Sequence, residues 1–275
     1  MPEHLCESPS TWHGAWMDTT RELPLGQVFN FRDYGGYQVA GGGRVRRGTL
    51  WRSGHHAQAT DADLEAIDAL ALAHVIDLRG NGERASQPVR LPAGFGGALL
   101  YFDGETAGLG HHMEAVEGAM SAEDAHRAME RLYASLPDRE NLLWILRRYF
   151  DGLATCQGPS LVHCHAGKDR TGMAVDLLHH ALGVHPDDAM ADFLLTNSVG
   201  DQEARIAQSA PTIRARYGAV DDETVRIVMG VDERYLHAAR AALVERFGSI
   251  DGFLEQALGV DADKRDALRL HLVES

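Results

Sequence analysis

A short stretch in the second half of the chain, residues 161–172, constrains the fold more than any other part of the sequence. It opens with the apolar residues Leu161 and Val162, passes through a turn that contains Gly167, and ends where a helical pattern begins. An apolar strand followed by a glycine-containing turn and a helix is typical of the βα units of open α/β sheets. The sequence therefore predicts an α/β fold, with a central, mostly parallel sheet flanked by helices.

The loop in this stretch has the composition of an anion cradle. Five residues separate Cys164 from Arg170, which is enough for successive backbone N–H groups to turn inward while the next helix presents its N-terminus. Gly167 permits a backbone conformation that is closed to other residues. A phosphate or a sulfate is therefore the expected occupant of the loop. The predicted binding residues are His165, Ala166, Gly167, Lys168, Asp169, Arg170 and Thr171.

Cys164 lies at the centre of the predicted cradle. The helix dipole, the inward amides and the Arg170 guanidinium all favour a thiolate there, and a thiolate can attack phosphorus. Arg170 offers a planar fork that binds two phosphoryl oxygens at once. Thr171 can direct its hydroxyl at the sulfur, whereas His163 is better placed to brace the loop than to act as a base. We therefore predict Cys164 as a nucleophile and Arg170 as its catalytic partner.

This loop resembles the signature of the protein tyrosine phosphatase superfamily, which is His-Cys, five residues, Arg, then Ser or Thr. Its Gly-Lys-Asp-Arg-Thr-Gly form is similar to that of bacterial phosphatases that accept phosphotyrosine, phosphoserine or phosphothreonine, and phosphoinositides. The resemblance covers most of the chain. It extends to the segments 30–36, 51–53, 75–79 and 234–259.

The resemblance implies a cysteine-dependent phosphatase that hydrolyses phosphomonoesters through a phosphocysteine intermediate. Phosphorylated proteins or phosphoinositides are the implied substrates. It also implies a helical C-terminal lid, for which residues 198–230 are the candidates. No cofactor and no metal is expected, because a thiolate attacks phosphorus without a Lewis acid.

A general acid is also needed, above all for an alkyl leaving group, because an alkoxide is far more basic than a phenolate. Many relatives supply an aspartate from a Trp-Pro-Asp loop, but this sequence contains no such tripeptide. The candidates are, in order, Asp169, Asp77 and Asp103. Asp77 and Asp103 follow predicted strands, whose carboxyl ends line the ligand crevice of an α/β sheet. Asp169 lies in the loop, where it can equally accept from loop amides and then be a poor acid.

Composition limits the partners. The net charge of −14 argues against nucleic acid or an anionic membrane surface as a constitutive partner. No long apolar span and no signal segment is visible, so stable membrane insertion is not expected. Three cysteines are too few for a disulfide framework, which favours the cytoplasm as the location of the protein. Secretion without a visible signal segment stays open. Lys168 is one of only two lysines, and this placement predicts that it meets a second phosphate or a head group.

The rest of the chain predicts a single domain over residues 1–275, with an irregular arm at 1–26. A run of three glycines at 41–43 predicts a hairpin between residues 37 and 52, whose arginines would form a basic rim. Further strands are expected at 74–78 and 98–102. A capping box at Thr60 and a terminal Gly183 mark two helices. Helices are expected from 60 onward and at 121–135, 138–154, 171–182, 186–197, 200–217 (opened or broken by Pro211), 231–247, 250–258 and 261–273.

Three alternatives remain open. His163, Cys164 and His165 have the side chains of metal ligands, although in a continued strand the two histidines would share one face and the cysteine would lie on the other. A non-catalytic phosphate- or phosphopeptide-binding module would use the same loop, but it has no need of the cysteine. Sulfur transfer on a cysteine loop is the third alternative, and Arg170 and Thr171 favour phosphate over it.

Overall fold

The computed structural model describes residues 21–106, 121–155, 158–200, 202–218 and 220–275. Its central sheet has five strands in the order β1-β3-β6-β4-β5. These strands are β1 (Arg32–Asp33), β3 (Leu50–Ser53), β4 (His74–Asp77), β5 (Ala98–Tyr101) and β6 (Ser160–His163). The pairs β3·β6, β6·β4 and β4·β5 are parallel, and β1 joins β3 antiparallel at one edge. The predicted α/β fold with a mostly parallel sheet is confirmed.

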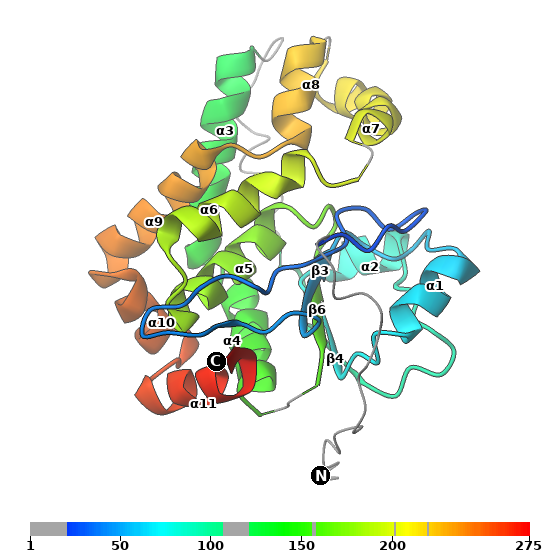
Figure 1. The fold of residues 1–275 in the computed structure, drawn as a ribbon. Helices are drawn as coiled ribbons and strands as arrows, with labels where there is room; N and C mark the ends of the chain where they lie inside the picture. The colour runs from blue at the N-terminus through cyan, green and yellow to red at the C-terminus, as the bar shows by residue number, and fades with distance from the viewer. Residues whose placement is uncertain (1–20, 107–120, 156–157, 201, 219) are drawn as a thin grey trace.

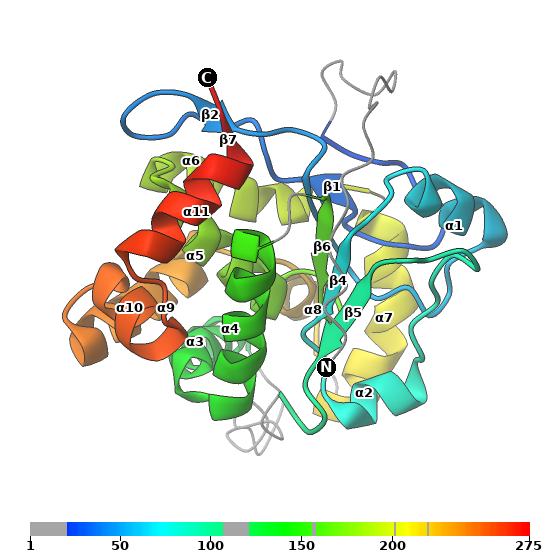
Figure 2. The ribbon, with the colours of Figure 1, turned by 90° about the horizontal axis from the view of Figure 1, so that it is seen from below.

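Helices cover both faces of this sheet. In Figures 1 and 2, α1 and α2 lie on one side, and α4, α5 and α11 lie on the other. The helices of the described residues are α1 (Asp61–Asp68), α2 (Asn81–Ser86), α3 (Ala122–Ser135), α4 (Glu140–Thr155), α5 (Asp169–Leu182), α6 (Pro186–Leu194), α7 (Gln202–Tyr217), α8 (Asp222–Met229), α9 (Glu233–Phe247), α10 (Ile250–Leu258) and α11 (Ala262–Leu272), with short 3₁₀ turns at Leu136–Asp138 and Leu195–Asn197.

Alternate residues of the inner strands face two separate cores. Val75 and Leu161 pack with Ile67 of α1 on one face. Ile76 and Val162 pack on the other face, in the larger core that includes α4 and α5. This period of two is what a strand imposes on its side chains. It holds β6, the middle strand, between two layers, and so it fixes the point at which the chain emerges into the loop at Cys164.

Most predicted helices are confirmed, and so are two of their end signals. Thr60 Oγ1 accepts from the Asp63 backbone N–H at 3.1 Å, and the Asp63 carboxylate accepts from the Thr60 N–H at 2.9 Å. This reciprocal pair is the predicted capping box of α1. Gly183 ends α5 with a φ of 85°, in the left-handed region that glycine adopts at little cost.

The sequence predicted that Pro211 opens or breaks its helix, but the helix is continuous through Pro211. It lies inside α7, where Ala210 and Ile213 are buried in a cluster with Val225 of α8. This packing on both sides of the proline compensates for the backbone hydrogen bond that proline cannot donate.

The predicted hairpin over residues 37–52 forms only in part. Gln38 and Arg44 pair antiparallel across the glycine turn, but β3 continues into the parallel sheet beside β6. The strand β2 (Arg44–Val45) pairs instead with β7 (Val273–Glu274). Sequence patterns did not reveal this partner, because it lies at the opposite end of the chain.

Some predictions fall outside the described residues, namely most of the arm at 1–26 and the cysteines Cys6 and Cys156.

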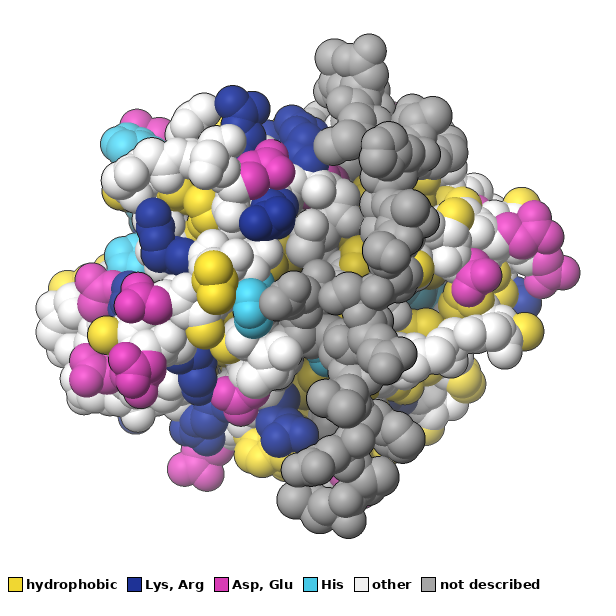
Figure 3. Space-filling view, turned by 60° about the horizontal axis from the view of Figure 1, so that its bottom comes forward, with side chains coloured by type: hydrophobic (Ala, Val, Ile, Leu, Met, Phe, Trp, Pro, Cys, Tyr) yellow, Lys and Arg dark blue, Asp and Glu magenta, His cyan; other side chains and the backbone are white. Residues whose placement is uncertain are grey.

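Among the described helices, none is long and apolar enough to cross a membrane. On the face drawn in Figure 3, the described acidic and basic side chains are interspersed. The described part of this face therefore carries no continuous basic stripe of the kind that binds a phosphate polymer.

Candidate active site

β6 delivers Cys164 to the middle of the carboxyl edge of the sheet. The strand ends at His163, the loop runs from Cys164 to Lys168, and α5 begins directly after it. Cys164 is a free thiol with 2% of its surface exposed. Gly167 has a φ of +70°, and a Cβ there would lie 2.4 Å from the carbonyl carbon and oxygen of Ser53. Glycine is therefore required for the loop conformation and for its close approach to β3.

A buried polar network supports the loop. The carbonyl oxygen of Gly167 accepts hydrogen bonds from Asn30 Nδ2 at 2.7 Å and from Arg52 Nη2 at 3.0 Å. Arg52 Nη1 donates to Asp192 Oδ2 at 2.8 Å, and Arg32 Nη2 lies 3.6 Å from the same oxygen. We call Asn30, Arg32, Arg52 and Asp192 the loop floor. The segment at 30–36, which resembled the phosphatase family, thus lies beside the loop and fixes its backbone.

The loop floor carries more positive than negative charge. Burial alone would raise the pKa of Asp192, but the guanidinium groups of Arg32 and Arg52 outweigh burial and hold that pKa at about 2. Burial, together with the neighbouring Arg52, lowers the pKa of Arg32 to about 10, which still leaves Arg32 protonated at neutral pH. Two cations therefore share one anion at the floor, and the excess positive charge favours a bound anion in the loop.

Arg170 is held by a carboxylate that the sequence analysis did not predict. Its Nη1 and Nη2 each donate to Glu83 of α2 at 2.6 Å. Glu83 also accepts from the backbone N–H of Gly80 at 3.1 Å, which anchors the carboxylate at the start of α2. Burial alone would lower the pKa of Arg170, but the hydrogen bonds of Glu83 raise it instead. Glu83 occupies the Nη1–Nη2 edge of the fork, so the Nε–Nη2 edge is left for a phosphoryl group.

Two buried histidines lie next to the loop. His163 Nδ1 donates to the carbonyl of Cys164 at 3.3 Å. The His163 ring stacks on that of His56, with centroids 5.0 Å apart, and His56 Nε2 lies 3.0 Å from Ser53 Oγ. Burial lowers the pKa of both histidines, so both are neutral at pH 7. These contacts suit the bracing role predicted for His163.

Asp169 is the candidate acid that lies in the loop region itself. It is the first residue of α5, and its side chain is 21% exposed. Its Oδ1 accepts from Tyr133 Oη at 2.8 Å and lies 3.5 Å from Lys168 Nζ. Burial, and then the charge of Asp169, raise the pKa of Tyr133 well above its usual range, so Tyr133 keeps its proton and donates. The carboxyl group is therefore oriented by a fixed donor.

The other two candidate acids lie in less suitable places. Asp77 is fully buried and pairs with Arg79 at 2.7 Å. Burial alone would raise the pKa of Asp77, but His163 and Arg79 hold it at about 2. Such a group carries no proton at neutral pH, so this environment does not suit the acid that the sequence analysis placed second. Asp103 is exposed and accepts from Asn81 Nδ2 at 3.0 Å.

The described residues of the predicted lid segment lie against the loop at two points. Lys168 Nζ donates to the carbonyl oxygens of Val228 at 2.6 Å and Gly230 at 3.1 Å. Arg205 Nη2 of α7 donates to the carbonyl oxygen of Ala166 at 3.4 Å. We call α7 and α8 the cover. They contact the loop through hydrogen bonds to backbone carbonyls.

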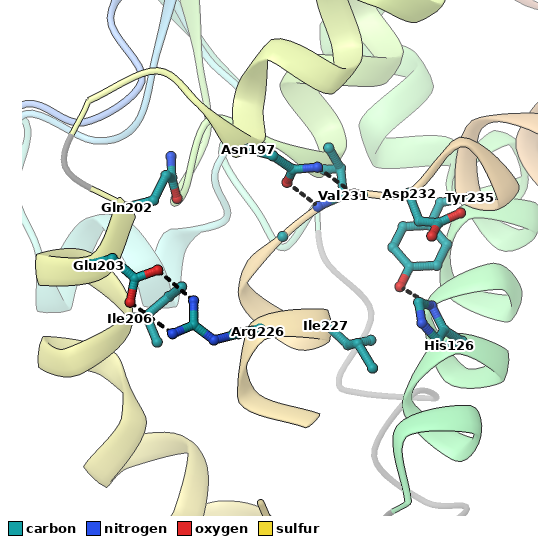
Figure 4. Close-up of a pocket in the computed structure, with 11 residues that line it drawn as sticks. His126, Asn197, Gln202, Glu203, Ile206, Arg226, Ile227, Val231, Asp232 and Tyr235 are labelled. Carbon is teal, nitrogen blue, oxygen red and sulfur yellow. Dashed lines mark hydrogen bonds and ion pairs between the residues drawn. The ribbon is translucent and has the colours of Figure 1, made fainter. Parts of the chain in front are cut away.

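A cavity of about 300 Å³ lies between the cover and helices α3 and α9 (Figure 4). At its edge Glu203 of α7 pairs with Arg226 of α8 at 2.8 Å, and Asn197 exchanges hydrogen bonds with the backbone of Val231 at 2.8 and 2.9 Å. Cys164 and its loop do not line this cavity. The cover therefore lies beside this cavity, and it packs on α3 through a small hydrophobic cluster that includes Ala125 of α3.

Two of the predicted cations have partners within the protein. Lys168 was expected to meet a second phosphate, but its side chain is 7% exposed and is bonded to carbonyls at the end of α8. The last carbonyl groups of a helix have no partner within the helix, which explains why the ammonium group of Lys168 binds there. Among the arginines predicted to form a rim, Arg52 is instead buried in the loop floor, and Arg44 lies in β2, which pairs with β7.

Sequence reasoning missed Glu83 and Asp192 as functional residues, and it misplaced Arg52. A signal for Glu83 existed, since Gly80 and Glu83 have the spacing of a helix start directly after a strand. Asp192 had no local signal. It lies within α6, and both arginines that it pairs with are far away in the sequence.

The His-Cys-His triplet does not gather around one point. His163 faces Asp77, with Nε2 3.8 Å from Oδ2, whereas the His165 ring lies against that of His55, tilted by 41° with the centroids 4.9 Å apart. Within the described ranges, no three His, Cys, Asp or Glu side chains are arranged to hold a metal ion. The geometry therefore gives no support to the metal-binding alternative.

A buried thiol at the base of a βα loop, with an arginine fork beside it and a parallel sheet behind it, defines a class of phosphate-handling α/β proteins. A sequence model of the tyrosine phosphatase family matches residues 23–274. The chain belongs to the tyrosine phosphatase family, and it is a phosphatase.

Individual relatives agree with this family. The chain is 35% identical over 252 residues to a protein of Cupriavidus necator that is provisionally named a tyrosine-protein phosphatase, covering 87% of this chain and 85% of the relative. It is 34% identical over 267 residues to the triple specificity protein phosphatase PtpB of Mycobacterium tuberculosis, covering 86% and 93%. A tyrosine-protein phosphatase of Nostoc commune is 27% identical over 236 residues, covering 80% and 73%.

Proposed function

We propose that this protein hydrolyses phosphomonoesters through a phosphocysteine intermediate on Cys164. The observation that carries the proposal is the loop itself, in which the buried Cys164 lies beside Arg170 and Arg170 is oriented by Glu83. The excess positive charge of the loop floor stabilises a thiolate and a phosphate dianion alike. The same surroundings therefore serve the nucleophile and the substrate.

In the first step, Cys164 Sγ attacks phosphorus in line, so that a P–S bond forms while the bond to the leaving oxygen breaks. Arg170 binds two non-bridging oxygens through Nε and Nη2. In the second step, water attacks phosphorus, the P–S bond breaks, and inorganic phosphate and the thiolate are released. Thr171 Oγ1 is buried and without a hydrogen-bond partner in the described part of the chain, so it is available to stabilise the departing sulfur.

Asp169 is the general acid in this proposal. Its protonated carboxyl gives a proton to the leaving oxygen in the first step, and the resulting carboxylate takes a proton from water in the second. Tyr133 acts through Asp169 as a positioning residue. We expect Asp169→Asn to lower kcat about a hundredfold for an alkyl phosphate and much less for an activated aryl phosphate. Asp77→Asn should not change this dependence on the leaving group, and if it does, Asp77 rather than Asp169 is the acid.

The proposed substrates are phosphotyrosine, phosphoserine or phosphothreonine, and phosphoinositides. A built-in acid supports this range, because serine and inositol leave as basic alkoxides. The relative from Mycobacterium tuberculosis is named a triple specificity phosphatase, which supports a broad range here as well. Parallel assays with a phosphotyrosine peptide, a phosphoserine peptide and a phosphatidylinositol phosphate test it. Activity confined to phosphotyrosine would contradict the broad range.

The phosphocysteine mechanism is tested by Cys164→Ser. This variant should lose hydrolysis of a generic aryl phosphate while it still binds inorganic phosphate, because the loop amides and Arg170 remain. Rapid acid quenching of the wild type during turnover should trap phosphate on Cys164. A Cys164→Ser protein that remains active would overturn the mechanism, and a wild type that binds phosphate without turnover would favour the binding-module alternative.

A further inference from the structure

Arg205 is the charged residue that reaches from the cover to the loop. Only 4% of its surface is exposed. Its Nη2 donates to Ala166 O at 3.4 Å, and its guanidinium carbon lies 5.9 Å from the centre of the Phe29 ring. The hydrogen-bond distance and the cation–π distance are both near the upper limit for contacts of these types. The two contacts hold the side chain in place without using most of its hydrogen-bonding capacity.

The guanidinium of Arg205 is not satisfied by these contacts. Its Nη1 is buried, and over the described residues it has no hydrogen-bond partner. Burial lowers the pKa of Arg205, and the charges of Asp169 and Cys164 act in the opposite direction. A buried cationic donor without a partner is costly unless an anion comes to it.

Arg170 and Lys168, the two cations in the loop itself, already have partners. Glu83 binds Arg170 through two hydrogen bonds. Lys168 is bonded to two cover carbonyls and lies 3.5 Å from Asp169. No carboxylate of the described ranges forms an ion pair with Arg205. Unlike Arg170 and Lys168, Arg205 is therefore a buried cation beside the loop that still lacks a paired carboxylate.

We propose that Arg205 is a further phosphate-binding residue of this site, and that its Nη1 donates to a non-bridging oxygen of the phosphoryl group bound above Cys164. This inference rests on the proposed function and adds one element to it. The phosphate site is completed by a residue of the cover, so bound phosphate holds α7 against the loop. A cover residue then distinguishes a phosphate dianion from a neutral ester.

The first test uses Cys164→Ser protein and inorganic phosphate, titrated by calorimetry. Adding Arg205→Gln should weaken phosphate binding by about tenfold or more, as expected for one lost charge-assisted hydrogen bond. Adding Arg205→Lys should weaken it less, because the charge remains but the fork is lost. The matched control is Arg214→Gln, which removes another arginine of α7 that pairs with Asp222 on the surface. Equal phosphate affinity in Arg205→Gln and Arg214→Gln would overturn the proposal.

A second measurement covers the case in which Arg205→Gln does not fold. Hydrogen exchange of the α7 backbone in the otherwise unchanged Cys164→Ser protein should slow when inorganic phosphate is added, because phosphate ties Arg205 to the loop. Exchange that phosphate leaves unchanged in α7, while it slows in the loop, would also overturn the proposal. If the wild type shows no hydrolysis that depends on Cys164, the proposed function fails, yet both tests still decide whether Arg205 binds phosphate.

Discussion

The loop floor and the cover approach the same loop with charged groups, but they are built differently. In the floor, Arg32, Arg52 and Asp192 are fully buried and paired with one another, and two donors grip the carbonyl of Gly167. The cover reaches the loop through Arg205 and through the carbonyls that bind Lys168. Buried atoms without a hydrogen-bond partner among the described residues occur in both, namely Arg32 Nε, Arg52 Nε and Asp192 Oδ1 in the floor and Arg205 Nη1 in the cover. The difference is that both floor cations are ion-paired with Asp192, whereas Arg205 forms no ion pair within the described structure.

This difference separates two tasks. A buried network whose charges are paired with one another keeps its geometry whether or not a substrate is present, which suits the floor for holding the loop in a preformed shape. A cover whose buried Arg205 forms no ion pair gains free energy when an anion arrives, which suits it for responding to substrate. We therefore expect substitutions in the floor to reduce stability and activity together, and substitutions in the cover to act mainly on ligand binding.

The largest expected effect comes from Asp192→Asn. This change leaves Arg32 and Arg52 buried without their shared carboxylate, and the free energy of unfolding should fall by about 3 to 5 kcal/mol. The matched change in the cover is Arg226→Gln, which breaks the exposed pair with Glu203 and should leave stability nearly unchanged. Urea unfolding of both variants measures this. If Asp192→Asn and Arg226→Gln lower the free energy of unfolding by similar amounts, the floor and the cover do not differ in this way.

Next in size is a pair of glycine substitutions. Gly167→Ala places a Cβ against the carbonyl group of Ser53 at a positive φ, and we expect a loss of about 3 kcal/mol together with most of the activity. Gly200, next to the cover, also has a positive φ, but a Cβ there meets nothing within 4 Å. Gly200→Ala should therefore cost only about 1 kcal/mol. Denaturation midpoints and aryl phosphate assays on both variants check the contrast.

The smallest effect is a pH dependence on the sheet side of the loop. Asp77 has a pKa of about 2 in the folded protein, against an ordinary value of 3.8. A lowered pKa stabilises the fold at pH values above the ordinary one, and this stabilisation is lost as the pH falls toward the lowered one. The buried Asp77 should thus contribute about 2 kcal/mol at neutral pH. The stability difference between wild type and Asp77→Asn, measured by urea unfolding, should shrink as the pH falls from 7 toward 3.

Local signals predicted much of this architecture because their causes are local. The alternation of Val75 and Ile76, the capping box at Thr60 and the left-handed Gly183 each depend on a few neighbouring residues. The hairpin at residues 37–52 was only partly right, and Pro211 was read as a break. In both cases a contact from a distant segment, β7 for the first and α8 for the second, outweighed the local preference.

The site divides in the same way. The spacing of Cys164 and Arg170 was sufficient to indicate the family, because the proposed chemistry needs these two side chains at a fixed separation in one turn. Charge pairing was not predictable, because arginines and carboxylates of similar local sequence become buried or exposed according to where the chain brings them. Glu83, Asp192 and Arg205 come to lie beside the loop only through tertiary structure, which brings together residues that are far apart in the sequence.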